Sequence, residues 1–194
     1  MKGLLEICCG SFEDVKTAWQ NGADRVELNS ALYLGGLTPS TANLICAKEQ
    51  CSIPIVTMVI HSAGKEAVFH RAFDCVAQQE RAVEALISLG ADRILTSGGA
   101  PDVWSGRTQL QKLQSQYGKE ITFLAGSGVN AQNVKVLMEY TRIEQVHTSC
   151  RSWQPDVTAS LQDVDFSYDI SRKNAYETVD AVKVKEMRAA MPIL

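Results

Sequence analysis

The sequence predicts an α/β protein in which repeated βα units form a TIM-type barrel. Short apolar runs alternate with amphipathic stretches that end at glycines such as Gly22 and Gly90, as expected for strands and helices in turn. The segment 21–28, NGADRVEL, returns as the segment 89–96, LGADRILT. Each copy of this repeat contains the glycine that caps a helix, followed by an Asp-Arg pair at which the next strand begins. Repeated units of this kind produce a parallel sheet, most simply a closed barrel.

The first half of the chain contains three expected strands and two expected helices. An apolar run at 4–9 predicts the first strand, and Ser11 is suited to cap a helix over 12–21. A second strand is expected at 24–29, followed by a helix over 38–50 that has a proline in its first turn. The β-branched residues of 53–60 predict the third strand.

The second half continues the alternation around the segment 67–74, AVFHRAFD. A short apolar run that ends in His70, Arg71 and Asp74 is typical of a buried parallel strand whose C-terminal end opens into a site. The remaining strands are expected at 92–97, 121–125 and 145–149, and the remaining helices at 77–89, 102–117 and 131–140.

The C-terminal part departs from this pattern. Residues 151–174 are polar and are expected to form a long surface loop, in which Val164, Phe166 and Tyr168 alternate as in a short strand. An amphipathic stretch at 175–191 predicts a final helix on the outside of the barrel. The chain has 194 residues, of which 45% are hydrophobic, and this fits a single domain covering 1–194.

The composition argues against several classes of function. The net charge is −3 and no stripe of Lys and Arg is present, which argues against a nucleic-acid partner. No apolar run approaches the roughly 20 residues of a membrane span, and a charge at Glu6 comes too early for a signal peptide. We therefore expect a cytoplasmic protein without a membrane segment. None of the six cysteines forms a Cys-x-x-Cys pair, so they are expected to be free thiols.

The alternation of side chains along the strands predicts a polar barrel interior. In the first strand it separates Glu6 and Cys8 from Ile7 and Cys9. Because the outer helices need apolar partners, the polar member of each strand is expected to face inward. The residues assigned to the interior in this way are Glu6, Cys8, Arg25, Glu27, Asn29, His70, Asp74, Ser97, His147 and Ser149.

Two interpretations of this interior stay open. Carboxylates and histidines in a low-dielectric interior can transfer protons, so Glu6, Glu27, His70 and Asp74 are candidate catalytic residues. The structural alternative is a buried salt-bridge network of Glu6, Glu27 and Arg25. Candidate substrate-binding residues lie at strand ends or in the glycine turn after the strand at 121–125, where barrels often bind anions: Arg25, Arg71, Ser97, Gly126, Gly128, His147 and Ser149. The glycines of that turn have a structural alternative, which is to serve only the turn.

Seven motifs, in this order along the chain, resemble the CutC copper-homeostasis family. They are LEICC at 5–9, GADRVEL at 22–28, GGLTPS at 35–40, FHRAFD at 69–74, LTSG at 95–98, AGSG at 125–128 and EQVH at 144–147. The resemblance implies a (βα)8-type barrel, a cytoplasmic protein linked to copper handling, copper binding through cysteine in at least some members, and a homo-oligomer.

One departure from the family alters the expected fold. Family members are longer, and here only residues 61–66 lie between the third strand and the segment 67–74. A parallel connection needs a crossover of roughly a dozen residues or more, which these six residues cannot make. Compared with the family, a helix, the fourth strand and a further helix are missing, together with the Arg-Pro-Arg-Gly-Gly loop that follows the third strand. We therefore expect seven strands rather than eight and an incomplete or distorted wall. Unpaired strand edges favour self-association, as a homodimer or a homotetramer.

The resemblance makes Cys8 the candidate ligand of copper, because a soft thiolate suits Cu(I). It also implies a second cysteine at the end of the second strand, where this chain has Asn29. Cys75 and Cys150 directly follow residues expected at the barrel mouth and are further candidates. The predicted function is that of a cytoplasmic copper-homeostasis protein of CutC type that binds Cu(I) through cysteine. The alternative is a TIM-barrel enzyme that uses acid–base chemistry on a small anionic or sugar-like metabolite.

Overall fold

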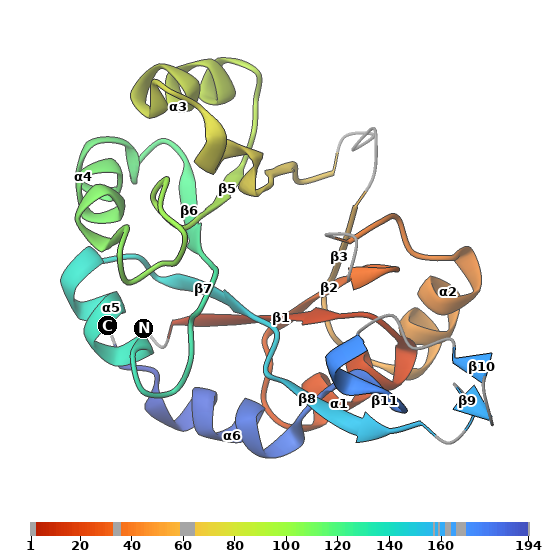
Figure 1. Ribbon diagram of the computed structural model, residues 1–194. Helices are drawn as coiled ribbons and strands as arrows, with labels where there is room; N and C mark the ends of the chain where they lie inside the picture. Colours follow the sequence, from red (N-terminus) through yellow and green to blue (C-terminus); the bar gives the residue numbers. More distant parts are fainter. Residues whose placement is uncertain are drawn as a thin grey trace.

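Seven strands form one parallel sheet in the computed structural model, which describes residues 3–32, 36–58, 65–156, 158, 160–161, 164–165 and 170–193. The strand order is β3-β2-β1-β7-β6-β5-β4. The sheet curls, and the helices cover its outer face (Figure 1). The strands are β1 (Leu4–Cys9), β2 (Arg25–Leu28), β3 (Ile55–Thr57), β4 (Val68–Phe69), β5 (Arg93–Thr96), β6 (Thr122–Ala125) and β7 (Gln145–Thr148).

The helices follow the strands in the expected alternation. The first helix begins after Ser11, whose hydroxyl accepts a hydrogen bond from the backbone N–H of Asp14 at 3.1 Å, as the sequence predicts for an N-cap. Gly22 and Gly90 have positive φ after the first and third helices, which explains the glycine at both places. The helices are α1 (Phe12–Gln20), α2 (Thr41–Gln50), α3 (Gln79–Ser88), α4 (Arg107–Tyr117), α5 (Val134–Thr141) and α6 (Ala181–Ala190).

The barrel is open between two strands that are consecutive in the sequence. In the described part of the chain, β3 pairs only with β2 and β4 pairs only with β5. Figure 1 shows the resulting gap between the β2–β3 side and the β4–β5 side. This confirms the predicted α/β barrel of seven strands with an incomplete wall. The short connection prevents closure because it leaves out the strand that would pair with both edges.

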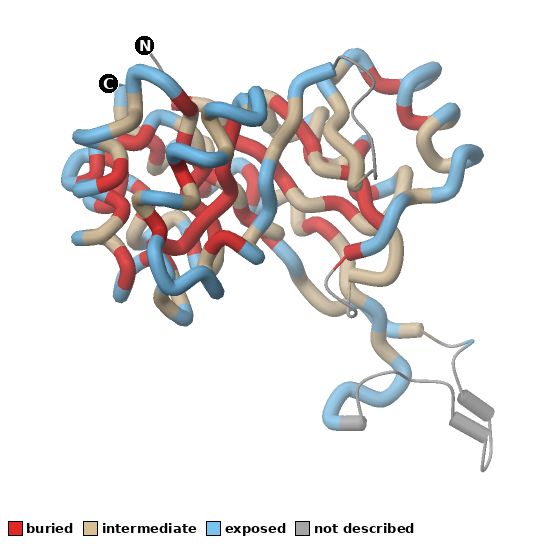
Figure 2. The backbone as a smooth tube through the Cα atoms, turned by 90° about the horizontal axis from the view of Figure 1, so that it is seen from above, coloured by how far each residue is buried: buried red, intermediate tan, exposed pale blue. Residues whose placement is uncertain are grey.

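The hydrophobic core lies between the sheet and the helices, as the buried segments in Figure 2 show. Alternate residues of β1 illustrate the arrangement: Leu5, Ile7 and Cys9 are fully buried under the helices. The largest fully buried side chains of the described residues include Phe73, Phe123, Leu110, Leu113, Leu137 and Met138. The sheet face away from the helices is therefore free for polar side chains.

The strand expected at 67–74 is shorter than predicted. Only Val68 and Phe69 pair with β5, and the chain then turns into a short 3-10 helix, η2 (Arg71–Cys75). The His70 ring caps this turn, since its Nδ1 accepts a hydrogen bond from the backbone N–H of Ala72 at 2.9 Å. A strand at the edge of the gap has a partner on one side only, which explains why it ends early.

The prediction of a surface loop at 151–174 is wrong for its first residues, and the prediction of a helix at 175–191 is wrong for its first residues, because both segments begin with a strand. The strand β8 (Arg151–Pro155) pairs antiparallel with β11 (Ala175–Val179). Helix α6 begins only at Ala181, after Asp180, whose side chain accepts hydrogen bonds from two backbone N–H groups. A strand pair with nineteen intervening residues has no local signal in the sequence, which is why the pattern of 151–174 is typical of a loop.

Smaller elements complete the C-terminal region. The strands β9 (Ser160–Leu161) and β10 (Val164–Asp165) pair antiparallel, and η3 (Ile170–Arg172) precedes β11. The short strand expected around Val164 is present at its first position, whereas Phe166 and Tyr168 lie outside the described residues. In the sheet region, α4 and α5 each begin a few residues later than predicted.

Candidate functional site

A cavity of about 550 Å³ opens at the C-terminal end of the parallel strands. Its lining comes from β1, β2, β5 and β7, from α1, from the segments that follow β2, β3, β4 and β7, and from the β8–β11 pair. The lining residues are Cys8, Asp14, Glu27, Asn29, Leu32, Gly36, Met58, His70, Arg71, Leu95, His147, Ser149, Arg151, Glu177, Thr178 and Val179.

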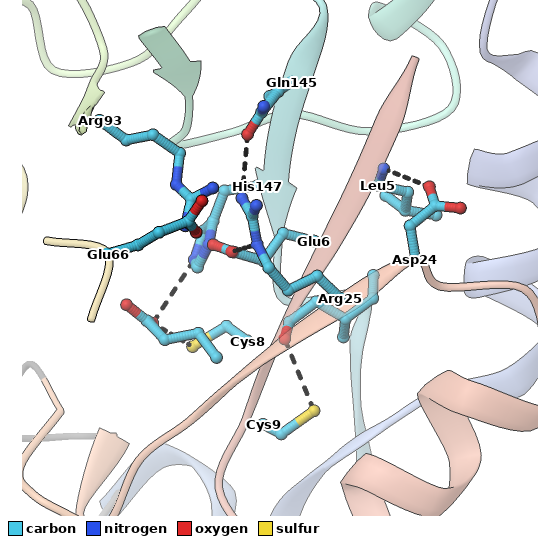
Figure 3. Close-up of polar contacts among 12 residues, drawn as sticks. Leu5, Glu6, Cys8, Cys9, Asp24, Arg25, Glu66, Arg93, Gln145 and His147 are labelled. Atoms are coloured by element: carbon cyan, nitrogen blue, oxygen red, sulfur yellow. Dashed lines mark hydrogen bonds and ion pairs between the residues drawn. The ribbon is translucent and has the colours of Figure 1, made fainter. Parts of the chain in front are cut away.

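Glu6, Cys8, Arg25, Glu27 and His147 form a polar cluster, of which Cys8, Glu27 and His147 line this cavity. Figure 3 shows Glu6, Cys8, Arg25 and His147 close together. Strand register brings the members of the cluster together, because Glu6 is aligned with Arg25 on one side and with His147 on the other. In the same register Cys8 is aligned with Glu27. Aligned residues of neighbouring parallel strands point to the same face, so the alternation seen in the sequence produces this cluster.

Glu6 is the centre of the cluster and is only 2% exposed. One of its carboxylate oxygens accepts a hydrogen bond from Arg25 Nε, and the other lies 2.8 Å from His147 Nδ1. Arg25 is held from its other end, since its Nη2 donates to Gln145 Oε1 at 3.0 Å. A buried carboxylate that is paired with an arginine and hydrogen-bonded to a histidine is stabilised in its charged form.

The two partners shift each other's pKa. Burial alone would raise the pKa of Glu6, but the hydrogen bond and charge of His147 and the charge of Arg25 lower it below its usual value. For His147, burial alone would lower the pKa. Hydrogen bonds with Cys8 and Glu6 and the negative charges of Glu27 and Glu6 instead raise it well above the ordinary value of a histidine.

Cys8, Glu27 and His147 form the part of the cluster that reaches the cavity. The Cys8 thiol donates to Glu27 Oε2 at 3.6 Å, and His147 Nε2 lies 4.0 Å from the same oxygen. One ligand atom from each residue lies within 4.8 Å of the others. Asn29 lies beside them, with its Nδ2 at 2.8 Å from Glu27 Oε2 and 3.8 Å from Cys8 Sγ.

This arrangement fits the spacing of metal ligands. Ligand atoms around a tetrahedral ion with bonds of about 2.0 to 2.3 Å lie roughly 3.3 to 3.7 Å apart, close to the 3.6 and 4.0 Å separations here. The donor set combines a sulfur, a nitrogen and an oxygen, and thiolate and imidazole are ligands of Cu(I) and Zn²⁺. Cys9 belongs to the opposite face, where its thiol donates to Ile7 O at 3.6 Å and burial raises its pKa well above the usual value. A single ion therefore cannot be held by both neighbouring cysteines.

His70, Arg71 and Ser149 also line the cavity, as expected for residues at strand ends. Two other residues assigned to this region lie outside the lining. Asp74 accepts hydrogen bonds from the backbone N–H groups of Ser97 and Gly99, and Ser97 is fully buried. Burial alone would raise the pKa of Asp74, but the hydrogen bond from the Thr96 hydroxyl, together with these backbone bonds and the bond from Arg71, lowers it.

The glycine turn after β6 does not line the cavity either. A Cβ atom at Gly126 would lie 2.6 Å from Leu95 Cδ1, so this glycine allows a close approach of two strands. Gly128 has a φ of +78°, which the turn requires. The structural alternative thus accounts for both glycines.

The two further cysteine candidates lie away from the cluster. Cys75 is exposed in η2 and is not part of the cavity lining. Cys150 is buried beside a second cavity of about 420 Å³ between the end of β7 and α6. Burial raises the pKa of the Cys150 thiol to about 11.

The sequence did not reveal the contribution of the β8–β11 pair to the mouth. Arg151 and Glu177 line the cavity and form an ion pair at 2.8 Å. Asp14 of α1 connects this pair to the barrel, because it accepts hydrogen bonds from the Thr178 hydroxyl at 2.8 Å and the Val179 backbone at 2.7 Å. The signal that could have indicated this contact is Asp14 itself, because it is a carboxylate on a helix face that is otherwise apolar and buried.

The fold and the cluster define the chain as a parallel α/β barrel protein with a polar site at the C-terminal ends of its strands. Comparison with protein-family models identifies the particular family, because residues 3–66 and 57–152 match the model of the CutC family. The chain belongs to the CutC family. The match divides into two segments at 57–66, which is the region where the sequence predicts a missing crossover.

Curated relatives agree with this assignment. The CutC family protein of Vibrio parahaemolyticus is 32% identical over 205 residues, covering 78% of this chain and 83% of its own. That of Glaesserella parasuis is 30% identical over 233 residues, covering 93% of this chain and 96% of its own. Both alignments are longer than the 194 residues of this chain, so the relatives contain residues that it lacks.

Solved structures support the fold. CutC from Streptococcus agalactiae, described as a candidate copper homeostasis protein, has a TM-score of 0.63 at 20% identity and covers 76% of this chain and 98% of its own. Thiamine phosphate pyrophosphorylase from Pyrococcus furiosus has a TM-score of 0.58 at 15% identity, and the match covers 97% of this chain and 94% of that enzyme. None of the described helices is long and apolar enough to cross a membrane.

Proposed function

We propose that this chain is a cytoplasmic copper-homeostasis protein that binds Cu(I) through Cys8, with His147 and Glu27 as its further ligands. The observation that carries this proposal is that the three ligand atoms, from three adjacent strands, lie within 4.8 Å of one another in the lining of the mouth cavity. A soft thiolate and an imidazole suit Cu(I), and the cavity gives an ion a path from solvent.

The surroundings of the three residues favour a preorganised site. Glu6 orients the His147 ring through Nδ1, so Nε2 points toward Cys8 and Glu27. Such a carboxylate partner behind a ligating histidine is common in metal sites because it fixes the ring and increases its basicity. Arg25 in turn holds Glu6. The cluster therefore needs little rearrangement to accept an ion in exchange for protons.

The test is an anaerobic competition titration of the purified chain against a chromophoric Cu(I) chelator. We expect one equivalent of Cu(I) per chain, and at least a tenfold weaker affinity in Cys8→Ser and in His147→Gln. The control is Cys75→Ser, which removes an exposed thiol outside the cluster and is expected to bind like the wild type. Unchanged Cu(I) binding by Cys8→Ser would overturn the proposal.

A second candidate function is acid–base catalysis. The position of His147 between two carboxylates favours it. A histidine hydrogen-bonded to Glu6 and facing Glu27 across 4.0 Å has the geometry of a proton-transfer group. On this proposal the substrate is a small anionic or sugar-like metabolite. A metabolite that raises the melting temperature of the wild type, but not of Glu27→Gln, would support it. A screen without any such compound would count against it.

We further propose that the chain self-associates as a homodimer or a homotetramer. The support is that β3 and β4 each have one partner in the sheet, which leaves backbone N–H and C=O groups at two edges. Phe69 of β4 itself and Val76, which follows η2, are exposed apolar side chains on this side of the gap. Light scattering after size-exclusion chromatography tests this, and a monomer at micromolar concentrations would contradict it.

A further inference from the structure

Arg71 stands at the cavity wall with its orientation fixed by two neighbours. Its Nε donates to Asp74 Oδ2 at 2.8 Å and its Nη2 donates to Ser97 Oγ at 3.0 Å. Asp74 is 7% exposed at its side chain and is itself held by the Thr96 hydroxyl and by backbone N–H groups. The guanidinium is thus kept in one orientation before any ligand arrives.

Most of the hydrogen-bonding capacity of Arg71 remains free. A guanidinium has five N–H donors, and two of them are used in these contacts. Among the residues that the structure describes, no acceptor pairs with the remaining donors. The side chain is 41% exposed and lines the mouth cavity, so these donors are available to a ligand. The planar fork of N–H groups matches the oxygens of a carboxylate or a phosphate.

The carboxylates of the cavity lining are already engaged elsewhere. Glu177 is paired with Arg151, and Asp14 accepts hydrogen bonds from the neighbouring strand β11. Glu27 accepts hydrogen bonds from Asn29 and from the cysteine thiol beside it. No carboxylate of the lining is therefore left to occupy the free side of the guanidinium.

A second, independent observation also indicates a ligand in this cavity. Asn29 is 3% exposed and lines the cavity, and its Nδ2 donates to Glu27, whereas its Oδ1 has no hydrogen-bond partner among the residues that the structure describes. Buried amide oxygens are normally paired, so this orphaned acceptor calls for a donor from a ligand. A hydroxyl group supplies one. The side chains of Leu32, Met58 and Leu95 add apolar surface for a short carbon skeleton.

We propose that the mouth cavity binds a small organic oxyanion that carries a hydroxyl group, with Arg71 on the anionic group and Asn29 on the hydroxyl. Hydroxycarboxylates and hydroxyalkyl phosphates share this chemistry, and a cavity of about 550 Å³ accommodates either. The inference goes beyond copper binding. It also sharpens the metabolite alternative, since it names the group that anchors the metabolite.

The experiment measures ligand binding to the metal-free protein by isothermal titration calorimetry and by the shift in melting temperature. Four probes separate the sources of the anion: glycerate and glycerol 3-phosphate carry the hydroxyl, and propionate and propyl phosphate lack it. We expect saturable binding of at least one hydroxylated probe and at least fivefold weaker binding of its counterpart without the hydroxyl. Whether the carboxylate or the phosphate binds identifies the anionic group.

Two variants of Arg71 assign the anchor. We expect Arg71→Gln to weaken the probe at least tenfold, and Arg71→Lys to weaken it as well, because an ammonium group cannot reproduce the fork. The lysine variant keeps the charge beside Asp74 and so guards against a loss that merely reports unfolding. The matched control is Arg107→Gln, since Arg107 stacks on Trp104 outside the cavity and its loss should leave binding unchanged.

The proposal is overturned if none of the four probes binds, or if Arg71→Gln binds the probe like the wild type. Equal binding with and without the hydroxyl would overturn the assigned role of Asn29. Because the protein is free of metal, each of these failures is independent of the Cu(I) titration. A chain that binds copper and no oxyanion would contradict only this inference.

Discussion

The two copies of the Gly-Ala-Asp-Arg joint make the same first contact in two different parts of the barrel. At the first joint, Asp24 Oδ2 accepts a hydrogen bond from the backbone N–H of Leu5 at 2.7 Å. At the second joint, Asp92 Oδ2 accepts one from the backbone N–H of Ala67 at 2.7 Å. Each aspartate thus fixes the start of the neighbouring strand. The repeated sequence produces a repeated local structure.

The arginines that follow differ in their surroundings. Arg25 pairs with Glu6, and their side chains are 7% and 2% exposed. Arg93 pairs with Glu66 at 2.5 Å, and their side chains are 8% and 67% exposed. In addition, Arg93 Nε is buried without a hydrogen-bond partner. The first pair belongs to β1, which has strands on both sides, whereas the second lies at the gap, where β4 has one neighbour.

The comparison separates what local sequence determines from what the sheet determines. The Asp-Arg joint forms the same local structure at both places where the sequence repeats it. Whether its ion pair becomes enclosed depends on a second neighbouring strand, which the missing crossover removes on one side. The loss of one partner destabilises the protein far more in a buried ion pair than in an exposed one, because an uncompensated charge remains buried. The two joints should therefore respond very differently to matched substitutions.

The largest expected effect is that of Arg25→Met in the enclosed pair. Removal of Arg25 leaves the Glu6 carboxylate buried with one cation fewer, and we expect a loss of about 3 to 5 kcal/mol in the free energy of unfolding. Urea denaturation monitored by circular dichroism measures it. The double variant Arg25→Met, Glu6→Leu should recover much of the loss. A loss below about 1 kcal/mol for Arg25→Met would mean that the cluster is hydrated in solution.

The cluster itself was largely predictable from the sequence. Alternation along β1 and β2 was sufficient to place Glu6, Cys8, Arg25 and Glu27 on one face, because strand side chains follow a period of two. The direct alignment of His147 with Glu6 follows from the order of strands in a barrel, in which the last strand pairs with the first. Local pattern and barrel topology therefore agree for this half of the molecule.

The opposite side and the C-terminal region were predicted less well, for physical reasons. The segment around His70 looked like a full strand because its apolar run is normal, yet an edge position ends the pairing after Phe69. The β8–β11 pair depends on a contact between residues 151–155 and 175–179, which no local period reveals. As a result the contribution of Arg151 to the mouth was missed, while the missing crossover itself was visible from the short connection at 61–66.

The next effect in size concerns the joint aspartates. Asp24 also receives a hydrogen bond from Arg188 of α6, while the contact with Ala67 is the one hydrogen bond recorded for the Asp92 carboxylate in the described structure. We expect Asp24→Asn to lower the free energy of unfolding by about 1.5 to 3 kcal/mol and Asp92→Asn by about half of that. Equal losses in the two variants would show that the αβ joint alone determines the effect, and that the hydrogen bond from Arg188 of α6 adds nothing to it.

A smaller effect is expected on the pH dependence of the free energy of unfolding. It tests whether a charged group also stabilises the open side of the barrel. The pKa of Asp74 is lowered, mainly because hydrogen bonds from Thr96, Gly99 and Arg71 outweigh its desolvation. The unfolded chain therefore binds more protons near the usual pKa of an aspartate, about 3.9. The stability that Asp74 contributes is present above that pH and is lost as the pH falls through the lower pKa of the folded state.

We therefore expect the free energy of unfolding to fall more steeply below about pH 4 in the wild type than in Asp74→Asn. Urea denaturation at a series of pH values between neutrality and acid measures both slopes. The residual slope of the variant includes the contribution of Glu6, whose pKa is also lowered. Identical slopes for the two proteins would mean that the contacts of Asp74 are not maintained in solution.

The smallest expected effect is that of Glu66→Gln, the counterpart of Arg25→Met at the edge of the gap. Because the Glu66 side chain is 67% exposed, its ion pair with Arg93 should contribute at most about 1 kcal/mol, and added salt should reduce the contribution further. Denaturation at low and high salt measures it. If the loss instead grows with protein concentration, a second copy of the chain covers Glu66, and the gap is closed between subunits. A small loss that is independent of concentration means that the second joint remains exposed and that the difference between the two joints persists in solution.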